Sequence, residues 1–366
     1  MTSSRRGGRL RSRAVAASLS VACSLVLASS GCTTATPGSG GPAAIQVAAT
    51  QAAPLPVRAG LNGKHVIAIS VDGLNPSVLA KLGRARTPYL HKLIYDQGAG
   101  TIQARSQIEM TVTLPNHTSM VTGRRISAAA GGHGVTWNSD TVTKTVQQAA
   151  GHDVSSVFQR VHSAGGKTAV FATKSKFALF NRSWPVSVDK SYIRVEQNSA
   201  VTKALRTDLI NVRRSFYFLH LGLPDQMGHT YGWMSPKYLA GVEYVDSLVG
   251  SVMRRVRLDP ELNRSTVIIL TSDHGGIPGT KNHGTATDPR NFTVPFAFWG
   301  AGVDNIPLYA LNPTRTQPGA STQPGFAASP QPIRNGEVAN AALDVLGLGP
   351  VAGSLWDRNQ DLAWHD

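Results

Sequence analysis

Cysteine is almost absent from this chain of 366 residues. The two cysteines that occur, Cys23 and Cys32, both lie within the first 32 residues, so a domain that begins after this segment has no thiol for an internal disulfide. A disulfide-stabilised fold is therefore excluded for the rest of the chain. We expect its stability to come from core packing, for which a hydrophobic share of 41% is sufficient, with metal ions as a further source.

The apolar run near the N-terminus is too short to span a bilayer comfortably. This run, AVAASLSVACSLVLASS, follows the basic leader MTSSRRGGRLRSR, and the pair predicts an export signal over residues 1–32. Cys32 follows Ser30 and Gly31, which resembles a lipoprotein cleavage site, so a lipid anchor on the outer face of the cell membrane and plain secretion are both open. Either route predicts an extracytoplasmic protein.

Charge is nearly missing from residues 33–63, which are rich in Thr, Ala, Pro and Gly and are predicted to form a flexible linker. We expect residues 64–366 to form one catalytic domain. Lysine and arginine exceed aspartate and glutamate by 36 − 21 = 15, and five arginines precede residue 14, which leaves 15 − 5 = +10. This excess suits a phosphorylated small molecule or an anionic polymer as substrate, but it equally suits general solubility, and it predicts no specific nucleic-acid recognition.

Polar alternation is missing from five short apolar runs, as expected of strands that are buried on both faces. These runs are HVIAISV (65–71), KTAVFAT (167–173), RSFYFLHL (214–221), STVIILT (265–271) and VPFAFWG (294–300). Three helices are predicted between and after these strands. The first begins at Thr87-Pro88 and ends at Gly98, and the second begins at Ser235-Pro236 and ends before Pro260. The third begins with Asn335 as its cap and ends at Gly347.

Strands that alternate with helices predict an α/β fold, with a mainly parallel central sheet and helices on both faces. Residues 304–331 have no periodic pattern, and we expect a long loop that covers or borders the functional site.

Acidic residues and histidines follow three of the predicted strands. They are Asp72, Asp225, His229, Asp273, His274 and, slightly further on, His283. Each one alone is more often a turn, cap or surface residue, but ligands of a doubly wound sheet lie beyond the carboxyl ends of its strands, so we expect these side chains to meet. Their mixed nitrogen and oxygen donors are too many for one tetrahedral ion. They predict two divalent ions, with Zn²⁺ the best match, which would clamp both oxygens of a phosphoryl displacement.

The segment TLPNHTSMVTG, residues 113–123, supplies a hydroxyl group at the start of a predicted helix. Pro115 suits a first helical turn, and a phosphate is favoured at that end of a helix. A metal-bound Thr113 would be a nucleophile, and Asn116 would donate its amide to a non-bridging oxygen. Without a metal cluster, Thr113 would be interpreted only as a helix cap.

Taken in order, these motifs resemble the nucleotide pyrophosphatase/phosphodiesterase family of the alkaline phosphatase superfamily. The matching segments are VDG with Asp72, TLPNH with Thr113, PDQMGH with Asp225, SDHGG with Asp273, NHGT with His283, and GGHGVTWN at 131–138. The likeness covers about residues 64–357, and the ordered set is specific although each motif alone is not.

The resemblance implies an alkaline phosphatase-like fold and a division of the ligands between two zinc ions. Asp72, Asp273 and His274 would hold the ion that activates Thr113, and the second ion would lie on the leaving-group side. The ligands implied for the second ion are Asp225, His229 and His283. The expected activity is hydrolysis of phosphodiester or pyrophosphate bonds through a covalent phosphothreonine intermediate.

Two departures from the family pattern bear on the substrate. Nucleotide-preferring members usually carry an aromatic residue directly after the nucleophile and often a lysine directly before it, whereas this chain has Leu114 and Val112. A phosphomonoesterase or a phosphonoacetate hydrolase-like enzyme is the alternative within hydrolases. The sulfatase nucleophile motif, with Pro and Arg after its cysteine or serine, is absent. A non-catalytic envelope protein that binds polyanions remains the alternative outside enzymes, and the oligomeric state is open.

Overall fold

The computed structural model describes residues 61–366. The predicted export signal, its Cys32 and residues 33–60 of the predicted linker lie outside this range. The last three linker residues lie inside it, and there the prediction was wrong, because Leu61 is buried against the core at 4% exposure and Lys64 N–H donates to the Leu61 carbonyl at 3.1 Å. Leu61 therefore belongs to the packed part of the chain, whereas Asn62 is exposed.

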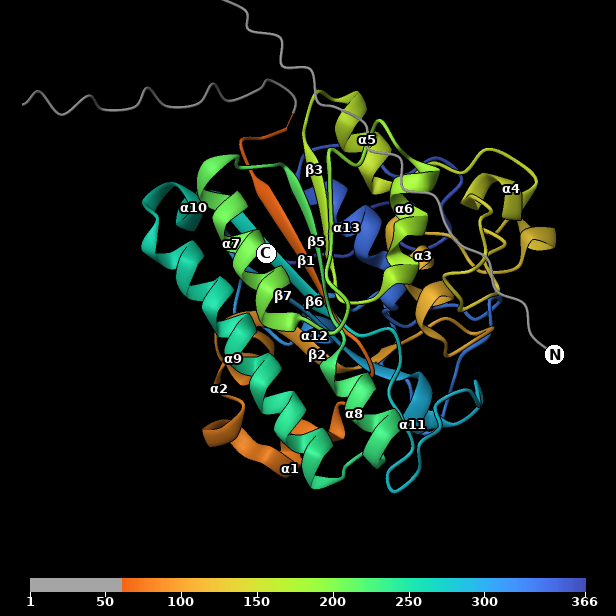
Figure 1. Cartoon of the computed structure of the whole chain (residues 1–366), viewed down its shortest axis with the longest axis vertical. Helices are drawn as coiled ribbons and strands as arrows, with labels where there is room; N and C mark the ends of the chain where they lie inside the picture. Colours follow the sequence, from red (N-terminus) through yellow and green to blue (C-terminus); the bar gives the residue numbers. More distant parts are fainter. Residues whose placement is uncertain (1–60) are drawn as a thin grey trace, which may run out of the picture. The chain divides into compact units, whose positions relative to one another are not determined.

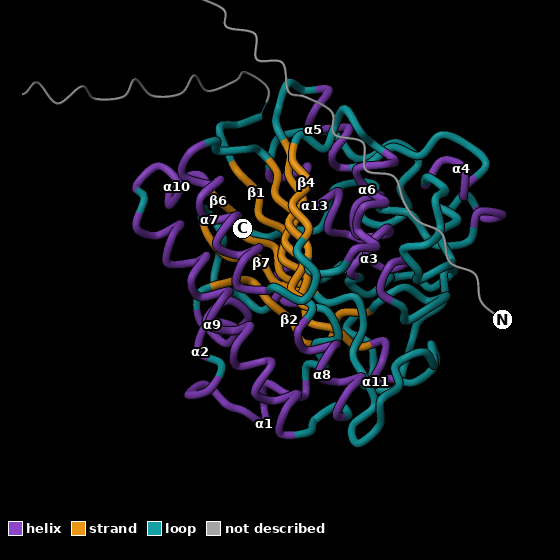
Figure 2. Tube along the Cα trace, in the orientation of Figure 1, coloured by secondary structure: helices purple, strands orange, loops and turns teal. Residues whose placement is uncertain are grey.

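Seven strands form one twisted sheet at the centre of the described residues (Figure 2). In sequence order they are β1 (His65–Val71), β2 (Gly98–Arg105), β3 (Thr168–Ala172), β4 (Lys190–Ile193), β5 (Phe216–Leu221), β6 (Thr266–Thr271) and β7 (Thr293–Gly300). Their order across the sheet is β2-β7-β6-β1-β5-β3-β4. Only β7 runs against the others, because it pairs antiparallel with both β2 and β6. The predicted mainly parallel sheet is confirmed.

All five predicted strands are present, while β2 and β4 were not predicted. The helix expected to end at Gly98 ends earlier, since α2 (Pro88–His91) passes into a π-helical turn over Lys92–Asp96 and Gly98 opens β2. A Cβ at Gly98 would lie 2.2 Å from the Leu93 carbonyl oxygen, so this glycine allows the strand to pass close to the turn before it.

Helices cover both faces of the sheet, as Figure 1 shows. One face carries α1 (Ser77–Arg86), α2, α7 (Asn198–Asn211), α8 (Leu223–Tyr231), α9 (Pro236–Leu258) and α10 (Pro260–Ser265). The other face carries α3 (Thr113–Thr122), α4 (Val146–Ala150), α5 (Val157–Ser163), α6 (Ala178–Ser183) and α13 (Val338–Val345). The short helices α11 (Pro289–Phe292) and α12 (Leu308–Leu311) lie in the loops around β7. No helix among residues 61–366 is both long and apolar enough to cross a membrane.

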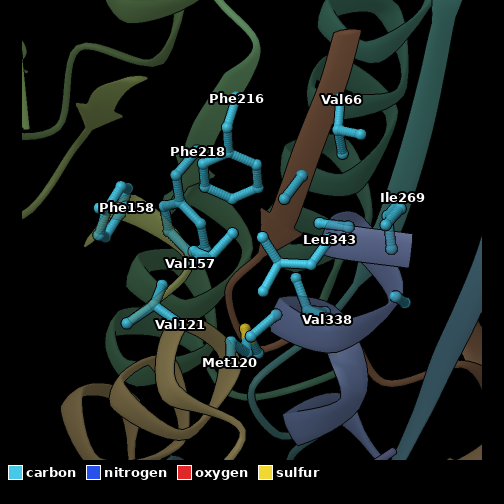
Figure 3. Packing of buried hydrophobic residues seen from close by; sticks show 14 of the residues in the cluster. Val66, Met120, Val121, Val157, Phe158, Phe216, Phe218, Ile269, Val338 and Leu343 are labelled. Atoms are coloured by element: carbon cyan, nitrogen blue, oxygen red, sulfur yellow. The ribbon is translucent and has the colours of Figure 1, made fainter. Parts of the chain in front are cut away.

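Two hydrophobic cores result, one on each face, because successive side chains of a strand point in opposite directions. In β1, Val66 belongs to the core under α3, α5 and α13, and Ile67 belongs to the core under α1, α7 and α9. Figure 3 shows Val66 on the same face as Phe218 of β5, Val121 of α3 and Leu343 of α13. Burial on both faces explains why these strands lack polar alternation.

The predicted helix limits hold for α9, where Ser235 Oγ accepts from Tyr238 N–H at 3.2 Å and Pro260 follows the end. The last helix ends near Gly347, which has a φ of +68°, as predicted. The Asn335 cap was wrong. The segment opens with a 3₁₀ turn over Asn335–Glu337, and the Asn335 side chain makes no capping bond.

The long loop over residues 304–331 packs beside the sheet edge that leads to α3. Buried Arg105, the last residue of β2, donates to the carbonyls of Thr322 and Gly319, both at 2.9 Å. The loop therefore borders the segment that enters α3.

Candidate active site

Thr113 is the first residue of α3 and is 1% exposed. The capping position belongs to Val112, whose backbone is extended and whose side chain makes no cap bond. The simple capping role considered for Thr113 is therefore wrong. Its hydroxyl oxygen lies 3.5 Å from Lys174 Nζ, which reaches it from the loop after β3.

The three aspartates follow strand ends at the same end of the sheet. Asp72 follows β1, Asp273 comes shortly after β6, and Asp225 lies in the first turn of α8, which follows β5. His274 Nε2 lies 3.6 Å from Asp72 Oδ1, 3.8 Å from Asp225 Oδ1 and 3.1 Å from Asp273 Oδ2. One imidazole nitrogen thus touches carboxylates that are up to 201 positions apart (273 − 72 = 201).

The other two histidines approach from the α8 side. His229 Nε2 is 3.3 Å from Asp225 Oδ1, as expected for residues four apart on a helix. His283 Nε2 is 3.1 Å from His229 Nε2, and its ring stacks on His274 with centroids 3.7 Å apart. His274 and His283 are buried, whereas the His229 side chain is 48% exposed. The structure therefore brings all six predicted ligands together, with His229 on the open side.

Hydrogen bonds aim the imidazole nitrogens inward. The Nδ1 atoms of His229, His274 and His283 lie 3.1, 2.9 and 2.7 Å from the backbone carbonyls of Lys281, Gly275 and Thr111. A carbonyl can only accept, so each Nδ1 must donate. His229 Nε2 faces two acceptors, His283 Nε2 at 3.1 Å and Asp225 Oδ1 at 3.3 Å, and therefore carries a proton, whereas the neutral rings of His274 and His283 keep a lone pair on the inward Nε2. This tautomer is the one that metal-ligating histidines use.

The residues present fit a metal site on independent grounds. Asp72 Oδ1, Asp225 Oδ1, Asp273 Oδ2 and His274 Nε2 are buried atoms without a hydrogen-bond partner among the described residues, and all four face one another. Buried polar atoms normally have partners, so a group of unpaired acceptors indicates a place for a cation.

Two groups of three side chains could each hold a metal ion, because within each group the donor atoms lie within 4.8 Å of one another. The first, Asp72, Asp273 and His274, is the set that the resemblance implies for the ion beside Thr113. The second contains Asp225 and His283 with His274, where the resemblance implies His229. His274 belongs to both sets, and His229 stands beside the second one.

The local electrostatics reflect this crowding. Burial would raise the pKa of Asp72, but Lys174 and His220 hold it well below its ordinary value. The pKa of Asp225 is also lowered, because Lys174 and His229 outweigh burial and the charge of Asp72. Burial and the Asp72 charge raise the pKa of Asp273 well above its usual range. Asp72 and Asp225 are therefore stabilised as carboxylates by the shared lysine, and Asp273 resists adding a third negative charge in the metal-free site.

Histidine pKa values are shifted mainly by burial. Burial lowers the pKa of His274 to about 3, with His283 as the next cause, and it also lowers the pKa of His283. The pKa of His229 is raised, chiefly by the Asp225 carboxylate 3.3 Å away. The two buried imidazoles are therefore neutral at pH 7, which is the form that binds metals.

Lys174, His220 and His117 join the site although the sequence analysis did not select them. His220 Nε2 is 2.7 Å from Asp72 Oδ2, and His117 Nδ1 is 2.7 Å from the Thr113 carbonyl and 3.6 Å from Asp273 Oδ2. Lys174 had a usable signal, because it follows the strand KTAVFAT as the aspartates follow theirs. His117 lies within the quoted TLPNH motif, while His220 stands inside an apolar strand and had no signal.

Asn116 faces away from the expected role. Its Nδ2 donates to the carbonyls of Met110 at 2.7 Å and Val112 at 3.0 Å, and its Oδ1 accepts from the Gln107 N–H. Both amide hydrogens are thus committed to the backbone that leads into Thr113. The structure differs here from the predicted donation to substrate, because both donors of the side chain are used by the backbone before α3.

The GGHGVTWN segment supports α3 from outside. His133 is buried with Nε2 3.0 Å from Ser119 Oγ, and Asn138 Oδ1 accepts from the Leu114 N–H at 3.0 Å. Burial lowers the pKa of His133 to about 3, so this histidine is a neutral structural residue. Asn138 satisfies a free N–H group in the first turn of α3.

Comparison with known proteins agrees with this geometry. The model of the type I phosphodiesterase / nucleotide pyrophosphatase family matches residues 66–314. The GPI ethanolamine phosphate transferase 1 of Neurospora crassa is 27% identical over 252 residues, which are 62% of this chain and 23% of that protein. This chain therefore spans less than a quarter of that relative's length.

Solved structures share the fold. The lipoteichoic acid synthase LtaP from Listeria monocytogenes has a TM-score of 0.56 and 15% identity, with 82% of this chain and 77% of that chain covered. A protein in the alkaline phosphatase superfamily from Vibrio parahaemolyticus has a TM-score of 0.52 and 12% identity, with 81% and 69% covered. These likenesses confirm the predicted alkaline phosphatase-like fold.

Proposed function

The chain belongs to the type I phosphodiesterase / nucleotide pyrophosphatase family, and we propose that it is a two-metal hydrolase that cleaves phosphodiester or pyrophosphate bonds with Thr113 as the nucleophile. The observation that carries this proposal is the group of four unpaired, buried ligand atoms. Two of them belong to aspartates that share Lys174, whose Nζ lies 3.5 Å from Thr113 Oγ1. A non-catalytic binding protein would have no need of a buried threonine hydroxyl that makes no helix-capping bond at that position.

Asp72, Asp273 and His274 would hold the ion next to Thr113, and Asp225, His229 and His283 would hold the other. Two bound Zn²⁺ ions would make a coordinated hydroxyl or water acidic enough to react at neutral pH and would neutralise charge on the transferring group. The protein's own side chains position the nucleophile. His117 fixes the Thr113 carbonyl, and the backbone bonds of Asn116 fix the turn before it.

The reaction would proceed in two displacements. The Thr113 Oγ–P bond forms as the P–O bond to the leaving group breaks, and the hydroxyl proton leaves with the departing alcohol or to solvent. Water then attacks the phosphothreonine, restoring the hydroxyl and releasing the phosphoryl product.

The substrate is proposed to be a phosphorylated small molecule or polymer. No base of such a substrate would stack on a side chain next to the nucleophile. Leu114 is 1% exposed and packs in the core under α3, so it offers no surface to a ligand. The net charge of the chain supports an anionic substrate.

The purified full chain would be assayed with an aryl phosphate diester, an aryl monoester and phosphonoacetate, each with and without a chelator. Preference for the diester, loss of turnover on chelation, and loss in Thr113→Ala with retained zinc would support the proposal. An acid-quenched tryptic digest should carry phosphate on the peptide that contains Thr113. Preference for the monoester or for phosphonoacetate would refute the diesterase proposal in favour of a phosphomonoesterase or a phosphonoacetate hydrolase-like enzyme. Zinc binding without turnover of any of the three substrates would favour a non-catalytic binding protein.

A transferase is a second candidate, because the relative from Neurospora crassa is named as an ethanolamine phosphate transferase. The same phosphothreonine would serve both activities, and only the acceptor would differ. Adding ethanolamine or glycerol to the diester assay distinguishes them, since a transferase would yield the new ester in preference to the hydrolysis product.

The location is proposed to be extracytoplasmic, either secreted or lipid-anchored through Cys32, on the basis of residues 1–32 alone. Cell fractionation of the wild type and of Cys32→Ser tests this. A lipid anchor predicts that the substitution moves the protein out of the membrane fraction, and plain secretion predicts no change. Retention of the wild type in the cytoplasm would refute the proposed location.

A further inference from the structure

Lys174 lies at the centre of the site although no metal-binding role needs it. It follows Thr173 at the carboxyl end of β3, and its Nζ is 2.6 Å from Asp72 Oδ2 and 2.7 Å from Asp225 Oδ2. These two carboxylates belong to different ligand sets. Lys174 therefore bridges the two proposed metal positions.

The carboxylate oxygens are divided between two tasks. The Oδ2 atoms of Asp72 and Asp225 face Lys174, while their Oδ1 atoms are unpaired and face His274. The lysine and a metal ion would thus use opposite oxygens of the same carboxylates. Metal binding does not require Lys174 to leave.

An ammonium group has three N–H donors. Two of them are used by the aspartates, and the nearest remaining acceptor is Thr113 Oγ1 at 3.5 Å, which is long for a hydrogen bond. An oxygen of a phosphoryl group attached to Thr113 would fall within reach of this third donor. The side chain is held in position by two charge-assisted bonds, so it needs little reorganisation when charge develops there.

We propose that Lys174 is a further catalytic residue, a fixed third cation that donates to a non-bridging oxygen of the phosphoryl group on Thr113. This inference rests on the proposed function. The position directly before the nucleophile, where the family often has lysine, is Val112 here, and Lys174 brings the same charge from the loop after β3.

Charge supports the assignment. With two divalent ions bound, the three aspartates would carry three negative charges against the four positive charges of the ions, and a threonine alkoxide would add one negative charge. The centre would then be neutral without Lys174. With Lys174 it carries one positive charge, which matches the single negative charge of a phosphodiester.

The test uses Lys174→Met, which keeps the aliphatic stem, and Lys174→Gln, which keeps a neutral donor and serves if the first variant folds poorly. Zinc affinity would be measured by competition with a chromophoric chelator, and binding of orthovanadate to the zinc-loaded protein by calorimetry. Diester turnover would be measured separately.

The expected result is zinc binding at least as tight as in the wild type, because the Oδ1 atoms remain and a repelling charge is removed. Vanadate binding should weaken by at least about tenfold, and kcat should fall by roughly 10²- to 10³-fold with a smaller change in KM. Lys190→Met is the matched control, because Lys190 Nζ also pairs with a buried carboxylate, Asp208 Oδ2 at 2.8 Å, away from the site. It should change neither zinc nor vanadate binding.

Zinc affinity that falls in Lys174→Met would show that Lys174 only holds the carboxylates together, and unchanged vanadate binding would show that it does not reach the phosphoryl group. Either outcome overturns the inference. The two proposals can fail separately. A wild type without turnover would refute the proposed function while the vanadate result stands, and an active Lys174→Met with normal vanadate affinity would refute only the role of Lys174.

Discussion

Asn335→Asp tests how α3, which carries Thr113, is joined to the segment after β6, which carries Asp273. Asn335 is fully buried, its Nδ2 donates to Asn116 Oδ1 at 3.1 Å, and the carbonyls of Ser272 and Asp273 each lie 3.2 Å from the same nitrogen. Its Oδ1 accepts from Gln107 Nε2 at 3.1 Å. One side chain therefore connects the first turn of α3 to the segment that carries Asp273.

The substitution keeps the shape of the side chain and removes its donors. Asn116 Oδ1 keeps the Gln107 N–H, but the carbonyls of Ser272 and Asp273 depend on the Asn335 amide. A protonated carboxyl group can donate to only one of these carbonyls, and an ionised one to neither, so at high pH both lose their partner. At about 1–3 kcal/mol for each unpaired buried group, we expect unfolding to be easier by roughly 2–5 kcal/mol at pH 8.

The loss should depend on pH in a defined direction. Burial among acceptors raises the pKa of a carboxyl group at this position above its unfolded value of about 3.9. Stability linked to a raised pKa is complete below the unfolded value and is lost as pH rises through the folded value. The difference from the wild type should therefore be smaller at pH 5 than at pH 8.

Urea unfolding of chelator-treated protein at both pH values measures the effect, followed by zinc affinity at pH 8. Asn340→Asp is the matched control, because Asn340 is also fully buried and donates to Ser354 Oγ at 2.9 Å and the Trp356 carbonyl at 2.8 Å. Asn340→Asp should lower the free energy of unfolding by a similar amount without lowering the zinc affinity. Wild-type stability of Asn335→Asp at both pH values, or zinc affinity no weaker than in the control, would refute the reasoning.

Three further predictions concern single groups. Burial raises the pKa of Asp246 to about 7 against the effect of two backbone N–H groups, so stability should fall as pH rises from about 4 to 7, and thermal melts of Asp246→Asn should lack this decline. A Cβ at Gly276 would lie 2.1 Å from the Trp233 ring, so Gly276→Ala should lower the free energy of unfolding, measured in urea, by about 1–3 kcal/mol. At Gly284 a Cβ would meet a single atom at 3.5 Å, so Gly284→Ala should change that free energy by no more than about 0.5 kcal/mol. Zinc added to chelator-treated protein should raise the melting temperature, and by less in His274→Ala; an equal shift in both would argue against a metal role for His274.

The central strands could be predicted because burial on both faces leaves a continuous apolar run. That rule missed β2 and β4 for physical reasons. β2 begins with Gly98 and Gly100, which are there because the preceding turn lies too close for a side chain. β4 has four residues, KSYI, at the edge of the sheet and only half-buried, so it carries neither an apolar run nor strict alternation.

In the site, the meeting of the six ligands followed from one rule about strand ends. The same rule applies to Lys174, but a lysine in TKSKF is expected on the surface, and only the position of β3 next to β5 brings it to Asp72. Asn335 was misread because asparagine before an apolar helix usually caps it. Local sequence describes contacts within a segment, whereas these two side chains bond across segments more than 100 positions away.

The unpaired atoms of the site also connect function to stability. Asp72 Oδ1, Asp225 Oδ1, Asp273 Oδ2 and His274 Nε2 each incur the cost of a buried polar atom without a partner, about 1–3 kcal/mol in the metal-free protein. No disulfide offsets this cost within residues 61–366, since both cysteines precede them. Lys174 and His220 reduce the repulsion at Asp72 but leave its Oδ1 free. A site arranged in this way is least stable when empty, so ligands that would bind metal should couple metal occupancy to folding as well as to chemistry.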